Sequence, residues 1–269
     1  MLLPAQTVAD AARAALARVA PASHSEIQVD LLLEAELRGI ASHGMLRLPR
    51  ILQRIANGVT DPRATGTHHW RSEGFLSVDG GAGLGPVVAL NAIRSLEERV
   101  ARTGIAVAAI RNSNHIGMLG YYAERSARQG MSMIALTTSE ALVHPWGGRR
   151  AMIGTNPVAI AVPAGGGEVF MMDTATGVVS MGEIHDHANR GEPIPPGWAV
   201  DAEGHPTTDA AAAKDGAIAP FGGPKGYALG LAFELLVTSL AGAAIGRDVT
   251  GTLDDTTICT TPSIERALR

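Results

Sequence analysis

A serine, a histidine and an arginine lie within six residues of one another in the segment 41–50, which reads ASHGMLRLPR. The imidazole of His43 can give or take a proton near neutral pH, and the guanidinium of Arg47 can bind a carboxylate through two hydrogen bonds. If the segment is helical, these two side chains share one face, with Arg50 one turn further on. Such a set suits a small acid whose neighbouring carbon is reduced or oxidised. A solvated helix start capped by Ser42 is the alternative.

A second candidate segment, residues 112–120, reads NSNHIGMLG and lies between an expected strand and an expected helix. Backbone N–H groups at such a junction suit a phosphate, and Gly117 and Gly120 let a ligand approach the backbone closely. His115 can contact a phosphate or polarise a carbonyl. A buried histidine bonded to a backbone carbonyl is the other interpretation.

The glycine-rich run at 80–85, GGAGLG, invites comparison with a dinucleotide-binding fingerprint. Counted from Gly81, however, the third glycine of that fingerprint falls on Pro86, and no acidic residue is clearly placed about 20 positions later. The run is therefore interpreted as a turn with structural glycines. A nicotinamide cofactor, if one binds, does not use a standard Rossmann loop.

Three later segments combine turn formers with polar groups: 154–157 (GTNP), 173–177 (DTATG) and 220–227 (PFGGPKGY). Thr155 lies in the first, and Asp173, at a strand end, can cap the chain or hold a ribose hydroxyl. Lys225 is expected in a glycine-flanked loop before a helix, where it can meet a phosphate or be an ordinary solvated lysine.

Two histidine pairs, His68 with His69 and His185 with His187, have no Cys or Glu partner at metal-ligand spacing. We expect both pairs in exposed polar stretches. Since a metal site needs three or four ligands, no metal is predicted.

The composition limits the class of protein. A net charge of −4 with scattered basic residues favours neither nucleic acid nor an anionic membrane as a partner. The single cysteine, Cys259, leaves no internal disulfide and fits a reducing compartment. The N-terminus lacks a continuous apolar run and is expected to form a helix capped by Thr7. No window is long enough for a membrane span, so we expect a soluble, cytoplasmic protein.

Hydrophobic periodicity predicts helices first and a sheet later. A second helix over 23–38 ends at Gly39, and a third, over 51–56, begins near Pro49. Further helices are expected over 86–102, 121–129 and 226–241, and strands over 75–78, 105–110, 133–138, 157–162 and 169–172. The late strands follow one another too closely for crossover helices, so part of the sheet must be antiparallel. The Ala-rich residues 210–214 are assigned to a polar connection.

The predicted fold class is therefore α/β, with a mixed, partly antiparallel central sheet, flanking helices and a helical substrate or dimerisation part. Three parts are expected: residues 1–72, helical, for substrate and dimerisation; residues 73–219, for the cofactor; and residues 220–269, returning to the first part.

Five blocks resemble the malate/L-lactate dehydrogenase family that lacks the Rossmann fold: RGIASHGMLRLPR, NSNHIG, PWGGRRAMIGTNPVAIAVPA, DTATG and PFGGPKGYALGLAFELL. They run in order from about Arg38 to Leu236. The chain looks most similar to the delta-1-piperideine-2-carboxylate/delta-1-pyrroline-2-carboxylate reductases of that family. The resemblance implies a homodimer, a small imino or keto acid substrate, and NADP(H) more than NAD(H).

The resemblance also implies roles for single residues. Ser42 and His43 would serve catalysis, with His43 as the proton donor, although other family members assign the acid–base role to the histidine that matches His115. Substrate would be bound by Arg47, Thr155, Met181 and Gly182. The cofactor would lie along His115, Ile116, Gly117, Met118, Leu119, Asp173, Thr174, Ala175, Pro224 and Lys225.

Glu183 separates the subfamilies. Hydroxy-acid dehydrogenases of the family tend to carry a basic residue after the glycine that matches Gly182, whereas the imine reductases have an acid there that completes the Ser-His arrangement. A carboxylate near His43 would raise the pKa of that imidazole and keep it charged as a proton donor. An acid in the first turn of a helix, favoured by the helix dipole, is the alternative.

Family chains continue past the helix at 226–241, whereas this one ends in TICTTPSIERALR. The main functional hypothesis is NAD(P)H-dependent reduction of a cyclic imino acid to L-pipecolate or L-proline. The alternatives are an NAD(P)-dependent 2-hydroxy acid dehydrogenase and a non-catalytic, truncated family member.

Overall fold

The computed structural model of the protein describes residues 3–251, which fall into two compact units. The first unit contains residues 3–122, 241–243 and 251, and the second contains residues 123–240 and 244–250. The three parts expected from the sequence are defined by function and stay a prediction. Cys259 and the C-terminal tail lie outside the described residues. No helix within residues 3–251 is long and apolar enough to cross a membrane.

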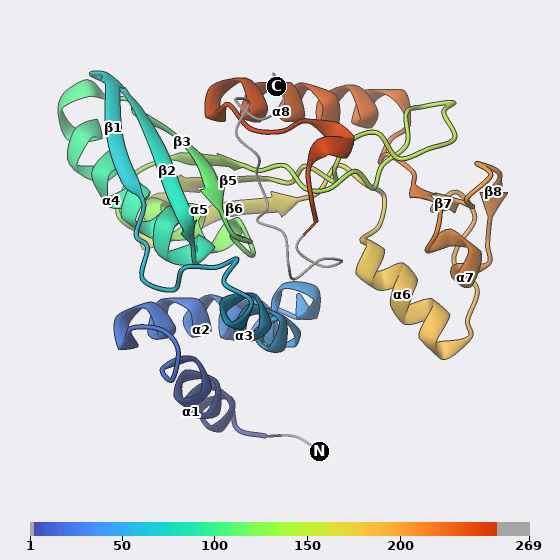
Figure 1. Ribbon diagram of the computed structural model, residues 1–269. Coiled ribbons are helices and arrows are strands. Elements are labelled where there is room, and N and C mark those ends of the chain that lie inside the picture. The colour runs from blue at the N-terminus through green and yellow to red at the C-terminus, as the bar shows by residue number, and fades with distance from the viewer. Residues whose placement is uncertain (1–2, 252–269) are drawn as a thin grey trace. The chain divides into compact units, whose positions relative to one another are not determined.

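The first unit has three N-terminal helices, a three-stranded sheet and a long helix that packs on that sheet (Figure 1). Its elements are α1 (Ala5–Leu16), α2 (Ala22–Leu37), η1 (Ala41–His43), η2 (Met45–Arg47), α3 (Leu48–Ala56), β1 (Thr67–Ser72), β2 (Phe75–Gly83), α4 (Gly85–Thr103), β3 (Val107–Ser113) and the start of α5 (Gly120–Arg128).

Small and aliphatic side chains pack between the N-terminal helices. Leu16 of α1 and Val29 of α2 are fully buried in this cluster. The expected cap at Thr7 is wrong, because α1 begins at Ala5 after Pro4, and no side chain caps it. The fixed φ of proline sets an extended residue there and lets the helix begin earlier. The expected end of α2 is right: Gly39 has a φ of 77°, the left-handed value that ends helices.

The sheet of the first unit has the order β1-β2-β3, with β2 antiparallel to β1 and parallel to β3. Alternate residues of β2, including Leu76 and Val78, are buried and pack on Val88 and Ala92 of α4. The sequence predicted only the first part of this strand, from the short apolar run at 75–78. The edge strand β1 was not expected, because its letters THHWRS are mostly polar.

The glycine-rich run is not a turn but the end of β2 and the start of α4. A Cβ at Gly85 would lie 2.3 Å from the carbonyl oxygen of His115 and 2.6 Å from that of Asn114. The glycine is therefore required because another segment of backbone passes next to it.

The second unit contains two small sheets and four helices or parts of helices (Figure 1). Its elements are the rest of α5, β4 (Met133–Leu136), β5 (Val158–Pro163), η3 (Gly165–Gly167), β6 (Val169–Thr174), α6 (Met181–Arg190), β7 (Ala199–Val200), β8 (Pro206–Thr207), α7 (Ala210–Ala213), β9 (Ala217–Ile218), α8 (Pro224–Ala241) and η4 (Gly246–Asp248). The pairs β4/β5 and β5/β6 are antiparallel, as the spacing of the strands predicts.

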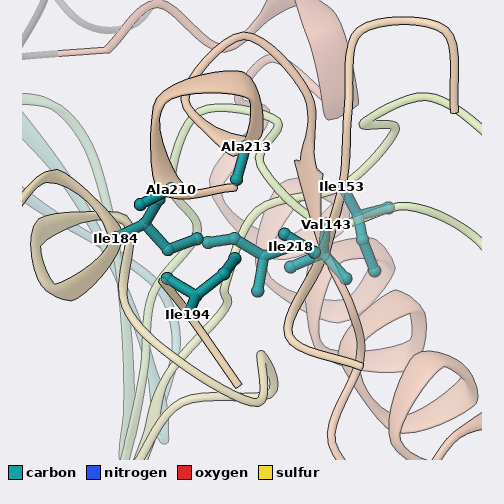
Figure 2. Packing of buried hydrophobic residues seen from close by; sticks show 8 residues of the cluster. Val143, Ile153, Ile184, Ile194, Ala210, Ala213 and Ile218 are labelled. Carbon is teal, nitrogen blue, oxygen red and sulfur yellow. The ribbon is translucent and has the colours of Figure 1, made fainter. Parts of the chain in front are cut away.

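A compact aliphatic core holds α6 and α7 on the sheet β8-β7-β9 (Figure 2). Its fully buried centre includes Ile184 of α6 and Ile218 of β9. Residues 210–213, expected in a polar connection, form α7, which begins where the carboxylate of Asp209 accepts hydrogen bonds from the N–H groups of Ala211 and Ala212. That cap and burial of the alanines outweigh the polar surroundings.

Candidate active site

The segment 41–50 does not form one helix, because η1 and η2 are separate 3-10 turns divided at Gly44, whose ψ is −149°. The expected placement of His43 and Arg47 at i and i+4 of one helix is therefore wrong. A Cβ at Gly44 would lie 2.2 Å from Oε2 of Glu36. That carboxylate oxygen accepts a hydrogen bond from the N–H of Met45 at 3.0 Å, so a tertiary contact sets the break.

The two turns nevertheless bring three of the expected site residues together. The Oγ of Ser42 lies 2.9 Å from Nδ1 of His43, which is a hydrogen-bonding distance. The Nε–H of Arg47 donates to the backbone carbonyl of Ser42 at 2.6 Å. When the serine hydroxyl donates to Nδ1, the neutral imidazole carries its proton on Nε2, available to a ligand.

His115, on the loop that follows β3, stacks on His43. Their ring centroids are 5.3 Å apart and their planes are inclined by 32°. Both histidines that the sequence singled out thus face each other, with Arg47 close enough to act on both.

Burial and the neighbouring cations keep both imidazoles neutral. Burial, together with the smaller effect of the Arg47 charge, lowers the pKa of His43 from 6.5 to about 4. Burial also lowers the pKa of His115 well below its ordinary value, followed by the charges of Arg47, His43 and Arg54. A carboxylate bound on Arg47 would offset that positive charge and raise both pKa values again.

The raised pKa that a nearby Glu183 would give His43 stays a prediction, because Glu183 belongs to the second unit. The expectation depended on a carboxylate next to the imidazole, and the groups that act on His43 are desolvation and the guanidinium of Arg47. At neutral pH the uncharged ring can either donate its one N–H proton or accept a second proton.

The loop of residues 115–119 is fixed by a hydrogen bond and by close packing against the first unit. The hydroxyl of Tyr122 donates to the carbonyl of Ile116, and Gly117, with φ of 72°, packs so closely on Leu31 that a Cβ would lie 2.3 Å from a methyl group. Met118 and Leu119 are buried. Contacts to a cofactor from the last two residues would therefore come from their backbone.

Two polar residues beside this loop were missed. Arg54 of α3 is 3% exposed, and its Nε and Nη2 donate to Oδ1 of Asn114 at 3.1 and 2.8 Å. The signal for Arg54 was a charge among the apolar residues Leu48, Ile51 and Ile55 of an amphipathic helix.

In the second unit, Thr155 lies on a turn that is bonded on several sides. Its N–H donates to Oγ of Ser139 at 3.0 Å, and its carbonyl accepts from the N–H and the hydroxyl of Thr176 at 2.7 and 2.8 Å. The side-chain hydroxyls of Thr155 and Ser139 are 3.4 Å apart.

Glu234 of α8 was also missed by the sequence analysis. Its carboxylate accepts hydrogen bonds from the same turn. It is fully buried, and its Oε2 accepts from the N–H of Gly154 at 3.1 Å and from Nδ2 of Asn156 at 2.5 Å. Its Oε1 accepts from the N–H of Gly246 at 2.5 Å. The signal for Glu234 was a lone acid in a helix that is otherwise uncharged after Lys225.

The remaining cofactor candidates lie at the end of β6 and the start of α8. Asp173 and Thr174 are the last residues of β6, and Ala175 follows them. Pro224 and Lys225 are exposed in the first turn of α8, so the expectation of a loop there is wrong. The N–H groups of a first turn suit a phosphate, as a glycine-rich loop would.

Met181, Gly182 and Glu183 form the first turn of α6, capped by the hydroxyl of Ser180. The carboxylate of Glu183 is half exposed and lies 3.7 Å from Nε2 of His187. The position matches the helix-dipole alternative, and its part in catalysis stays a prediction.

The histidine pairs have bonding partners other than a metal. Nδ1 of His68 lies 3.0 Å from Oγ of Ser95, and Nδ1 of His187 lies 2.9 Å from the carbonyl of Pro193. His68 and His187 are half-buried, so the expectation of exposed pairs holds for only one member of each. Within residues 3–251 no three His, Cys, Asp or Glu side chains are grouped to hold a metal.

Comparison with known proteins supports the resemblance stated from the sequence. The profile of the malate/L-lactate dehydrogenase family matches residues 3–263. The L-sulfolactate dehydrogenase of Methanocaldococcus jannaschii is 38% identical over 240 residues, which cover 89% of this chain and 69% of that protein. The Delta(1)-pyrroline-2-carboxylate reductase of Pseudomonas fluorescens is 38% identical over 224 residues, which cover 83% of this chain and 66% of that protein.

Solved structures agree with the expected fold. A dehydrogenase from Sinorhizobium meliloti has a TM-score of 0.94 and 54% identity, covering 97% of this chain and 77% of its own. The sulfolactate dehydrogenase structure from Methanocaldococcus jannaschii has a TM-score of 0.89 and 35% identity, covering 97% and 75%. The mixed α/β fold of the sulfolactate dehydrogenase type, predicted from the sequence, is confirmed.

Proposed function

Because this chain belongs to the malate/L-lactate dehydrogenase family, we propose that it reduces a cyclic imino acid with a nicotinamide cofactor. It is an oxidoreductase, as its dehydrogenase and reductase relatives are. The proposed substrates are delta-1-piperideine-2-carboxylate and delta-1-pyrroline-2-carboxylate, and the products are L-pipecolate and L-proline.

The observation that carries the proposal is the Arg47 guanidinium beside the stacked rings of His43 and His115. The guanidinium binds the carboxylate of the imino acid and fixes the C=N bond near the imidazoles. Because the bound carboxylate raises the pKa of His43, a larger fraction of the imidazole is protonated at neutral pH when substrate is present. It then gives its proton to the imine nitrogen, and Ser42 holds the ring in place.

The second unit supplies the other proposed substrate contacts. Thr155 offers a hydroxyl from a turn that Ser139 and Thr176 hold in position. As the resemblance implies, we propose that Met181 and Gly182, in the first turn of α6, also bind the substrate and that Glu183 assists catalysis. The acid at position 183, where the resemblance gives the hydroxy-acid dehydrogenases a basic residue, supports an imine rather than a keto acid.

Each proposed cofactor-binding segment, taken by itself, offers groups that suit part of a nicotinamide cofactor. Lys225 and the first-turn N–H groups of α8 suit a phosphate, Asp173 to Ala175 offer a strand end with an acid, and the loop from His115 to Leu119 has a firmly held backbone. The bound cofactor supplies the hydride. We propose NADP(H) in preference to NAD(H), as the resemblance implies.

A 2-hydroxy acid dehydrogenase is the second candidate, and the low pKa of both histidines favours it. A neutral imidazole is already the base that oxidation of a hydroxyl needs. The sulfolactate dehydrogenase relative, at the same 38% identity, supports this alternative equally.

The deciding experiment follows loss of reduced nicotinamide absorbance with delta-1-piperideine-2-carboxylate, against pyruvate and oxaloacetate. Turnover of the imine that His43→Ala abolishes is the expected result. Turnover of keto acids alone would transfer the protein to the second candidate. No turnover of any of them by folded protein would support the non-catalytic alternative.

We also propose that the protein is a cytoplasmic homodimer, as the resemblance implies. Light scattering after size-exclusion chromatography gives the mass in solution directly, and a monomeric mass would contradict the proposal.

A further inference from the structure

Arg54 is a buried cation that the proposed reaction does not use. It lies on α3 with 3% of its surface exposed. Arginine keeps its charge in proteins, and placing a charge away from water is costly unless hydrogen bonds compensate. The fork formed by its Nε and Nη2 provides such bonds, because both nitrogens donate to Oδ1 of Asn114, at 3.1 and 2.8 Å.

Asn114 connects this fork to the end of β2. Its Nδ2 donates to the carbonyls of Ala82 at 2.6 Å and Gly83 at 3.2 Å, and its backbone N–H donates to the carbonyl of Gly83 at 3.1 Å. The amide oxygen is thus bonded to Arg54 and the amide nitrogen to the strand. Rotation of the Asn114 amide group would therefore break its hydrogen bonds to Arg54 and to the end of β2.

The residue directly after Asn114 is His115, which stacks on His43. The His115 carbonyl lies so close to Gly85 that no Cβ fits between them. The position of the His115 backbone is therefore determined by β2, by the start of α4 and, through Asn114, by Arg54.

We propose that Arg54 is a positioning residue that, through Asn114, holds His115 stacked on His43 beside the substrate-binding Arg47. The proposal rests on the function proposed above, in that it assigns the histidine pair to catalysis. A role limited to packing α3 would need no charge on this apolar helix face, where an aliphatic side chain would serve.

The charge itself has a second effect. Burial lowers the pKa of the His115 ring most, and Arg47 from η2, His43 from η1 and Arg54 from α3 lower it further, in that order. Arg54 therefore helps to hold His115 neutral, in addition to orienting it.

Two substitutions separate these effects. Arg54→Lys keeps the charge but replaces the fork by a single donor, whereas Arg54→Gln removes the charge and keeps a donor. Gln53→Ala, an exposed change on the same helix, is the matched control. His115 is followed by NMR titration of its ring, assigned with His115→Gln, and substrate reduction by kcat/KM across pH.

For Arg54→Gln we expect the pKa of His115 to rise and kcat/KM to fall at least tenfold. For Arg54→Lys, which keeps the charge, we expect a smaller rise in the pKa of His115 with a similar loss of kcat/KM, and for Gln53→Ala no change. If Arg54→Gln does not fold, the lysine variant still decides, because an unchanged kcat/KM overturns the positioning role. A His115 titration that is the same in wild type and Arg54→Gln overturns the electrostatic part.

The NMR titration does not depend on the substrate. If wild type reduces no imine, the titrations still show whether Arg54 acts on His115, so failure of the proposed function is distinguished from failure of this inference. The ring-current shift between His43 and His115 reports the stacking in the same spectra, and its persistence in both Arg54 variants would refute the positioning role.

Discussion

The rings of His43 and His115 stack with their centroids 5.3 Å apart and their planes inclined by 32°. Each positive charge on one ring disfavours a charge on the other, so the two titrate as a coupled pair. We therefore expect the pair to carry at most one positive charge at neutral pH, and a carboxylate bound on Arg47, as proposed, would favour that charge.

Acid should destabilise the protein through His43. Its pKa falls from 6.5 to about 4 on folding, so the unfolded chain binds the proton more tightly than the folded chain. The contribution to stability is complete above about pH 6.5 and is lost as the pH falls towards 4. Urea unfolding at a series of pH values should show the free energy of unfolding decreasing in this range.

The matched variant is His43→Gln, which lacks the titrating group. Its free energy of unfolding should depend less steeply on pH between 6.5 and 4 than that of wild type. Equal slopes in the two proteins would show that His43 is not a source of the acid sensitivity.

Arg47→Met should weaken substrate binding more than it weakens folding. The loss of a two-pronged charged contact is expected to lower kcat/KM by about 100-fold, chiefly through KM. Arg47→Lys should recover only part of this, since a point charge cannot form the fork. Both variants should retain NADPH affinity, and a wild-type KM for the imino acid in Arg47→Met would contradict the assignment.

Glu183→Lys should exchange the substrate preference. We expect imine reduction to fall at least tenfold and reduction of oxaloacetate or pyruvate to appear, measured as a ratio of kcat/KM values. Glu183→Gln serves as the control for loss of the acid without gain of a base. The helix itself should lose only about 0.3–1 kcal/mol from a cation in its first turn. If both variants keep the wild-type ratio, Glu183 is simply a residue that stabilises the helix start.

Glu234→Gln should destabilise the turn that holds Thr155. The amide has one acceptor oxygen where the carboxylate has two, so its NH₂ group would face the N–H of Gly154 or that of Gly246. An unfolding free energy lower by about 1–3 kcal/mol is expected, with a raised KM for substrate.

The control for that variant is Glu203→Gln, the same chemical change at an exposed position of the same unit. It should leave the urea midpoint and KM unchanged. A wild-type urea midpoint for Glu234→Gln would show that the three hydrogen bonds accepted by Glu234 contribute no net stability.

Local sequence was sufficient for elements with a clear period or a clear end signal. The apolar run at the start of β2, the proline at the start of α4 and the glycine after α2 all predicted structure correctly. The strands β7, β8 and β9 have two residues each, too few to show a period. The break at Gly44 depends on Glu36, a contact that spacing alone does not reveal.

The same division applies to the candidate site. The residue types at Ser42, His43, Arg47 and His115 were visible in the sequence, but their stacking and low pKa depend on two distant segments meeting in a dry environment. Arg54 and Glu234 were visible only as charges in apolar helices, and their partners could not be inferred without the fold.

The bond between Glu234 and Gly154 joins residues 80 positions apart in the chain. A ribosome adding about 5–20 residues per second reaches the acid roughly 4–16 seconds after it has made the turn. During synthesis, the N–H of Gly154 and the Nδ2 of Asn156 must therefore stay hydrated until α8 is made, because Glu234 of that helix is their acceptor. We expect a nascent chain stalled before that helix to be cut readily by proteases at this turn, and one released after it to resist.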